Sequence, residues 1–100
     1  MLKMLPNHRI KEIVEAAVRS TLERGSFIRT FAEPILDFEG GDALRITIVI
    51  EPNAIDKLTG EAVMNTLAEI QDRLRDEGEE RFPIVEYATE EDLASVDDQH

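Results

Sequence analysis

The sequence contains no cysteine, and this absence excludes several kinds of chemistry. Without cysteine the chain forms no disulfide, offers no thiol nucleophile and holds no zinc or iron–sulfur centre on thiolates. Its two histidines, His8 and His100, lie near the two ends of the sequence, where a protected catalytic cleft is not expected. The sequence also lacks P-loop, nucleophile-elbow and dinucleotide-binding glycine patterns. We therefore expect no enzyme activity, no catalytic residues, no cofactor and no metal ligands.

Basic residues are scarce relative to acidic ones. The chain carries 11 Lys and Arg against 22 Asp and Glu, a formal net charge of −11. A nucleic-acid backbone would be repelled by such a protein unless a local basic patch opposed the overall charge. Residues 1–31 carry a local excess of basic side chains, whereas the remainder is strongly acidic. The main expectation is a protein partner, of basic character, and no nucleic acid. The alternative is a small RNA- or ribosome-associated domain that uses Lys3, Arg9, Lys11, Arg24 and Arg29.

Long apolar runs are also missing, so the sequence predicts no membrane span, and the Met1 to Pro6 stretch is too short for the apolar region of a signal peptide. We expect a cytoplasmic protein. With 100 residues, of which 42% are hydrophobic, the chain is suited to one compact core. The expected organisation is a single domain over residues 1–96 and a frayed tail over residues 97–100.

Two long helices are predicted from apolar residues that recur with helical spacing. The first covers residues 8–24, with Asn7 as its N-cap and Gly25 at its end. The second covers residues 60–77, begins after Thr59 and ends at Gly78. The core positions expected on these helices are Ile10, Ile13, Val14, Ala17, Val18, Val63, Leu67, Ile70 and Leu74, with Met64 and Ala68 beside them. Thr89 and the acids after it indicate a short helix to about residue 96.

Strands are predicted from alternation of apolar and polar residues. The strongest covers residues 43–51, and the Gly40-Gly41-Asp42 turn joins it to a short strand over residues 35–39. Residues 82–87 form a third strand, placed at a sheet edge by Pro83. Residues 26–34 fit either a loop or an edge strand. A single helical turn with a weak Asn53 and Asp56 capping pair follows the strand over residues 43–51.

These elements predict an α+β fold, a two-layer sandwich of order α-β-β-α-β. Its small sheet of about three strands is mainly antiparallel and is covered on one face by two helices. The connection through the second helix places the third strand beside the first, in the order 3-1-2, or beside the second. A sheet of this size has two exposed edges, which favours a homodimer as one expected assembly.

The uncovered sheet face is the first candidate interface, since Arg45, Thr47 and Val49 lie on it by alternation. The second is the third strand, where either Phe82 and Ile84 or Val85 and Tyr87 point outward beside Arg81. An exposed apolar pair there favours β-augmentation or dimerisation. The candidate partner interface therefore consists of Arg45, Thr47, Val49, Arg81, Phe82, Val85 and Tyr87. A further alternative is a carboxylate metal site or enzyme centred on Asp37, Glu39 and Asp42.

Overall fold

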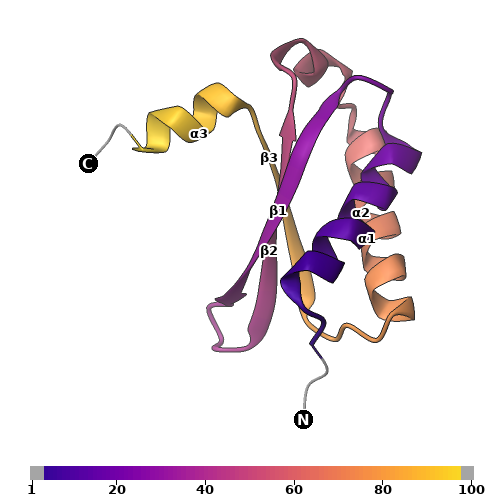
Figure 1. Ribbon diagram of the computed structural model, residues 1–100, viewed down its shortest axis with the longest axis vertical. Helices are drawn as coiled ribbons and strands as arrows, with labels where there is room; N and C mark the ends of the chain where they lie inside the picture. The colour runs from indigo at the N-terminus through magenta and orange to yellow at the C-terminus, as the bar shows by residue number, and fades with distance from the viewer. Residues whose placement is uncertain (1–3, 98–100) are drawn as a thin grey trace.

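The computed structural model describes residues 4–97, with elements in the order α-β-β-α-β-α. They are α1 (Asn7–Thr21), β1 (Phe27–Leu36), β2 (Asp42–Ile50), the 3-10 helix η1 (Pro52–Lys57), α2 (Gly60–Asp76), β3 (Phe82–Ala88) and α3 (Glu90–Asp97). The three strands form one sheet, with α1 and α2 on one side and α3 on the other (Figure 1). The predicted α+β class, with two helices covering one face of a small sheet, is confirmed.

The strand order is β1-β2-β3, so β2 is the central strand. It pairs antiparallel with β1 and parallel with β3, which makes the sheet mixed rather than mainly antiparallel. Of the two strand orders that the sequence left open, the one with the third strand beside the second is observed, and the order 3-1-2 is not. The reason lies in the helix layer: α1 packs over β1, so α2 covers the other half of the sheet and brings β3 to the free side of β2.

The core forms where the helical stripes meet the alternating residues of β2. Leu44, Ile46, Ile48 and Ile50 are almost fully buried, as the alternation predicts. The predicted stripe of α1 is buried as well, together with Ile70 and Leu74 of α2. Val63 and Leu67, predicted in the buried stripe of α2, are only half-buried. Met64 and Ala68, expected beside that stripe, are exposed, Met64 with an exposed fraction of 63%. The buried position in that part of α2 belongs instead to Thr66.

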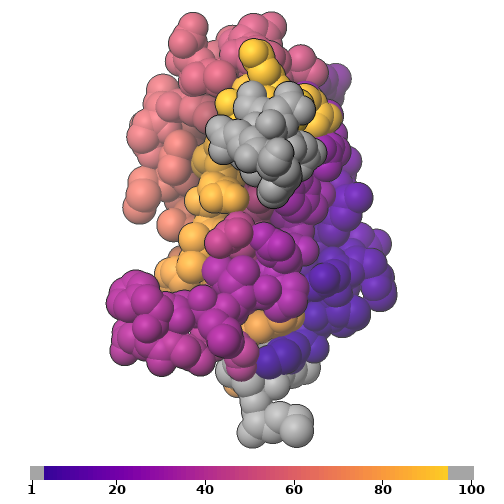
Figure 2. All heavy atoms as spheres, turned by 90° about the vertical axis from the view of Figure 1, so that its left-hand side faces the viewer, coloured from indigo at the N-terminus to yellow at the C-terminus, as the bar shows by residue number. Residues whose placement is uncertain are grey.

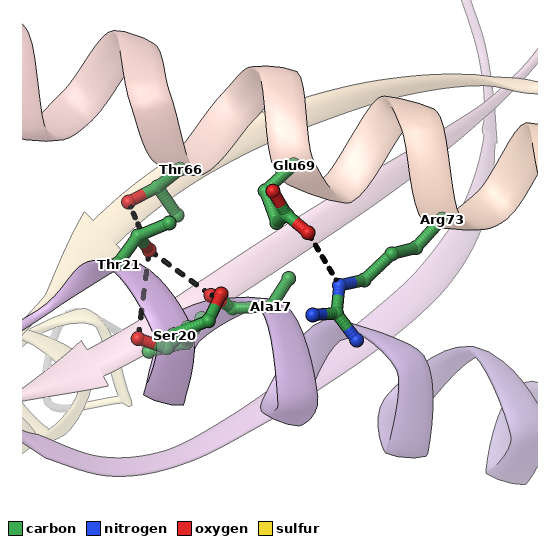
Figure 3. A network of polar contacts seen from close by, with 7 residues as sticks. Ala17, Ser20, Thr21, Thr66, Glu69 and Arg73 are labelled. Carbon is green, nitrogen blue, oxygen red and sulfur yellow. Dashed lines mark hydrogen bonds and ion pairs between the residues drawn. The ribbon is translucent and has the colours of Figure 1, made fainter.

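Thr66 is accommodated in the core because its hydroxyl is hydrogen bonded. It donates to the carbonyl oxygen of Ala62 at 2.8 Å. It also shares a hydrogen bond of 2.7 Å with the Thr21 hydroxyl of α1 (Figure 3). The Thr21 hydroxyl also lies 3.0 Å from the carbonyl oxygen of Ala17. Such bonds offset the cost of burying a hydroxyl, so this polar contact joins the two helices without disrupting the core.

The helix ends differ in part from the prediction. Asn7 is the first residue of α1 rather than its cap, and the capping position, Pro6, has no side-chain hydrogen bond. The helix ends at Thr21 because Leu22 is extended, and Gly25, with φ of +87°, belongs to the following turn. The predicted Asn53 and Asp56 cap is wrong, since η1 begins with Pro52 and has no side-chain cap.

The helix start predicted after Thr59 and the start predicted at Thr89 are both confirmed, and each threonine is a cap. The Thr59 hydroxyl accepts a hydrogen bond from the Ala62 amide at 3.0 Å and begins α2. At α3, the Thr89 hydroxyl accepts from the Asp92 amide and the Asp92 carboxylate accepts from the Thr89 amide, which is a reciprocal capping box. Asp97, placed in the frayed tail by the sequence analysis, is the last residue of α3, and residues 98–100 lie outside the described residues.

The segment over residues 26–34, left open between loop and strand, is mostly strand: β1 begins at Phe27 and forms one edge of the sheet. The predicted hairpin between β1 and β2 is confirmed, with Gly40 at φ of +85° in the turn. Its first strand ends at Leu36 and not at residue 39 as predicted, so residues 37–39 belong to the turn. The edge position predicted for the third strand from Pro83 is also confirmed.

Candidate interaction face

The candidate site is the side of the sheet opposite α1 and α2. We call it the helix-free face because neither long helix covers it, although the short helix α3 lies over its upper end (Figure 1). The strand register and the alternation of side chains define its members. They are Arg29, Phe31, Glu33 and Ile35 of β1, Ala43, Arg45, Thr47 and Val49 of β2, and Phe82, Ile84, Glu86 and Ala88 of β3. Figure 2 looks toward the molecule from this side, with α3 in yellow over the upper part and the hairpin turn in magenta protruding below.

The upper part of the helix-free face is partly covered. Arg29 of β1 forms an ion pair of 2.8 Å with Glu90 of α3. This ion pair crosses over the central strand β2 near Val49, the residue that faces Arg29 in the sheet. The Arg29 guanidinium also lies over the Phe31 ring, 5.4 Å from its centroid. Val49 and Thr47 are consequently buried, with exposed fractions of 0% and 3%. The face expected to be open to water is therefore open only in part.

Below α3 the face contains a shallow hollow of about 670 Å³. Its lining consists of Arg29, Phe31, Glu33, Arg45, Thr47, Glu86 and Leu93. Arg45 binds Glu33 at 3.1 Å, so both arginines of the hollow are paired with carboxylates. Glu86 accepts a hydrogen bond of 3.2 Å from the Thr47 hydroxyl and, among the described residues, has no cation partner. The hollow is therefore left with an uncompensated negative charge.

The other end of the helix-free face is apolar. Phe82 and Ile84 of β3 have exposed fractions of 61% and 41%, and they lie beside Ala43 and Arg45 of β2. Phe38, in the hairpin turn at the same end of the sheet, is fully exposed. Large side chains gathered in this way on a surface commonly mark a binding site.

The seven residues of the predicted interface are divided between three environments. Arg45, Thr47, Val49 and Phe82 lie on the helix-free face, where Arg45 and Phe82 are exposed. Val85 and Tyr87 point to the other side and pack against the core. The outward pair of β3 is thus Phe82 and Ile84. Arg81 is buried, with an exposed fraction of 7%.

Arg81 forms a buried ion pair with Glu79, in which its Nε donates to the carboxylate at 2.8 Å. The same carboxylate accepts from the Leu5 amide at 2.7 Å, and Arg81 donates to the Leu5 carbonyl oxygen at 3.2 Å. Burial opposes ionisation of Glu79, but hydrogen bonds from Arg81 and from two backbone amides lower its pKa below the ordinary value. The pair therefore fastens the segment before α1 to the α2–β3 connection, and its role is structural.

The residues named for the RNA-binding alternative and for the carboxylate metal site are engaged elsewhere in several cases. Arg9 binds Glu77 at 2.8 Å and Arg29 binds Glu90, so each is neutralised on a different element, and Lys3 lies outside the described residues. The Asp37 carboxylate accepts from the backbone amides of Glu39 and Gly41 and so holds the hairpin turn. Within the described part of the chain there is no group of three or more His, Asp or Glu arranged to hold a metal ion.

The predicted interface did not include five residues that line the hollow: Arg29, Phe31, Glu33, Glu86 and Leu93. Ile84 was predicted only as part of one of the two possible outward pairs of β3. The strand residues among these follow from the period of two, once residues 27–36 are assigned as a strand and Phe82 is assigned as outward. Leu93 carries no such signal, since its place depends on how α3 leaves the sheet.

None of the helices described here is long and apolar enough to cross a membrane. In comparisons with known proteins, no protein-family model, no curated protein and no solved structure matches the chain.

Proposed function

We propose that this chain is a non-enzymatic protein-interaction module that binds a basic protein through the lower part of its helix-free face. The observation that carries the proposal is the exposed pair Phe82 and Ile84 beside Glu86, a carboxylate with no cation partner among the described residues. An apolar centre with a charged rim is the usual composition of a protein interface.

Charge supports a basic partner. Arg29 and Arg45 are neutralised by Glu90 and Glu33, so they add little attraction for an acidic surface. Glu86 remains, and the chain as a whole carries a formal charge of −11. A partner with Lys or Arg beside apolar side chains would match this face, and the overall charge would accelerate its association at low salt.

The position of the apolar pair on an edge strand supports the same conclusion. In the part of the chain that the structure describes, one side of β3 has no neighbouring strand. Its backbone groups can therefore pair with an extended segment of the partner, except at Pro83, which has no amide proton. Affinity would then come from main-chain hydrogen bonds and specificity from Phe82 and Ile84. Homodimerisation through an edge and a cytoplasmic location stay predictions from the sequence.

The test is affinity recovery of the tagged chain from its native host at low salt, with two matched double variants. Ile84→Ser with Glu86→Lys alters the helix-free face. Met64→Ser with Glu61→Lys makes the same changes on exposed positions of α2. We expect the wild-type chain to recover a stoichiometric basic protein that dissociates as the salt concentration rises. The Ile84→Ser and Glu86→Lys variant should no longer recover this protein, whereas the Met64→Ser and Glu61→Lys variant should recover it as the wild type does.

Three results would contradict the proposal. One is a partner kept by the first variant, and another is a partner lost equally with both. The third is recovery of the wild-type chain alone or with acidic proteins only. All four substituted positions are exposed and tolerate polar replacements, so both variants are expected to fold. Circular dichroism of each variant checks this.

A further inference from the structure

A second hollow lies on the other side of β1, between the end of α1 and the start of β1. We call it the α1–β1 hollow, and its volume is about 460 Å³. It is lined by Val18, Arg19, Leu22, Glu23, Arg24, Gly25, Phe27 and Ile28. None of these residues belongs to the helix-free face. The volume is within the range of about 300–1,000 Å³ that is usual for small-molecule sites.

A bulge in β1 shapes the floor of this hollow. Phe27 faces Ile50 and Arg29 faces Val49, so Ile28 is an extra residue without a partner on β2. Bulges redirect a side chain and are frequent beside functional sites. Ile28 is 37% exposed and lines the hollow together with Leu22 and Phe27, which pack against the core. The floor is therefore apolar.

The rim carries positive charge that the protein does not neutralise. The Arg19 guanidinium lies over the Phe27 ring, 5.7 Å from its centroid, which holds it at the hollow. Arg24 lies at the turn that follows α1. Within residues 4–94, Arg19 and Arg24 have no ion pair with a carboxylate. Each of the other six arginines in that range forms one. The one acid of the rim, Glu23, is bound to Lys57 at 3.3 Å.

We propose that the α1–β1 hollow binds a small amphiphilic monocarboxylate. Its apolar body lies on Leu22, Phe27 and Ile28, and its carboxylate is held by Arg19 and Arg24. Guanidinium groups match carboxylates because two parallel N–H donors meet two oxygens. The acid that lines the hollow, Glu23, is already ion paired with Lys57. Exposed charges that lie farther away than about 8 Å are screened at physiological ionic strength, so a net negative chain can still bind an anion at a local pair of arginines.

Octanoate is the probe, and octylammonium, which has the same alkyl chain and the opposite charge, is the matched control ligand. Titrations of the full chain are followed by amide chemical shifts, with Arg19→Glu, Arg24→Glu and Lys11→Glu as variants. Lys11 is an exposed cation of α1 outside the hollow, so its variant repeats the charge change elsewhere. We expect octanoate to shift residues 18–28. Either arginine variant should weaken its affinity about tenfold or more, as expected for loss of a charged hydrogen bond. Lys11→Glu should leave the affinity unchanged.

Four outcomes would overturn the proposal. They are absence of octanoate binding, equal binding of octylammonium in the same hollow, equal weakening by Lys11→Glu, and shifts confined to the helix-free face. All three substituted positions are exposed, and the spectra of the free variants report directly whether each is folded.

Discussion

Individual buried polar groups fall into two kinds in this protein. The Thr66 hydroxyl, between the two long helices, is fully hydrogen bonded (Figure 3). The Thr30 hydroxyl, on the core side of β1 opposite Ile48, is buried and has no hydrogen-bond partner among residues 4–97. A buried polar group costs free energy when it is unpaired and little when it is paired. The same substitution at the two positions should therefore have opposite effects.

We predict that Thr30→Val raises the free energy of unfolding by about 1 kcal/mol, because it removes an unpaired buried hydroxyl. Thr66→Val should lower it by about 1 kcal/mol, because two hydrogen bonds are lost. Urea unfolding of the two variants and the wild type measures both values. A loss of stability in Thr30→Val would show that its hydroxyl has a partner.

The buried Glu79 and Arg81 pair is a second feature at this scale. Glu79→Gln leaves the Arg81 charge buried without its counter-ion, so we predict a loss of about 3 kcal/mol in the free energy of unfolding. The control is Glu69→Gln, which breaks the half-exposed Glu69 and Arg73 pair on α2 (Figure 3) and should cost less than about 1 kcal/mol. Equal effects in denaturant unfolding would contradict the structural role given to Glu79.

The same carboxylate predicts a pH dependence. Because the pKa of Glu79 is lower in the folded protein than its ordinary value of about 4.3, its contribution is fully present above that value. The contribution is lost as the pH falls through the pKa of the folded state. Unfolding free energies measured at decreasing pH should therefore fall more steeply below about pH 4.3 in the wild type than in Glu79→Gln. Parallel curves would be inconsistent with this explanation.

Among the elements, those with one dominant period were predictable from the sequence. The helical stripe of α1 and the alternation of β2 correspond to what each element buries. The edge strand β1 was ambiguous because Arg29 and Glu33, both on its outer face, alternate with a buried Thr30 and a half-buried Ala32 rather than with large apolar residues. Packing against α1 and pairing with β2 stabilise it as a strand, and neither contact is visible in its local sequence.

The helices α2 and α3 should respond differently to loss of their caps. α2 contributes Ile70 and Leu74 to the core, whereas α3 lies on the opposite side of the sheet (Figure 1), and none of its described residues belongs to the core cluster. We predict that Thr59→Ala lowers the global free energy of unfolding by about 1 kcal/mol. Thr89→Ala should instead accelerate amide hydrogen exchange in α3 and leave global stability within about 0.5 kcal/mol. A global loss in Thr89→Ala would mean that α3 is part of the cooperative core.

At the scale of the whole molecule, two properties could not be read from the sequence. The strand order depends on which half of the sheet α2 covers. The connection from β2 through α2 to β3 is long enough to place β3 beside either β1 or β2. The accessible part of the helix-free face depended on α3, whose Glu90 binds Arg29 across the central strand. The face itself was predictable from the alternation along β2. Its accessible residues, Phe82 and Ile84, were one of two pairs that the alternation of β3 allowed.

The most direct test of the proposed interface is photo-crosslinking in the native host, with p-benzoylphenylalanine in place of Phe82 or, as a control, of Met64. Both positions are about equally exposed, Phe82 on the helix-free face and Met64 on α2, with exposed fractions of 61% and 63%. The proposal predicts one basic protein crosslinked from position 82 and not from position 64. Crosslinking of the same protein from position 64 alone, or no crosslink from position 82, would contradict it.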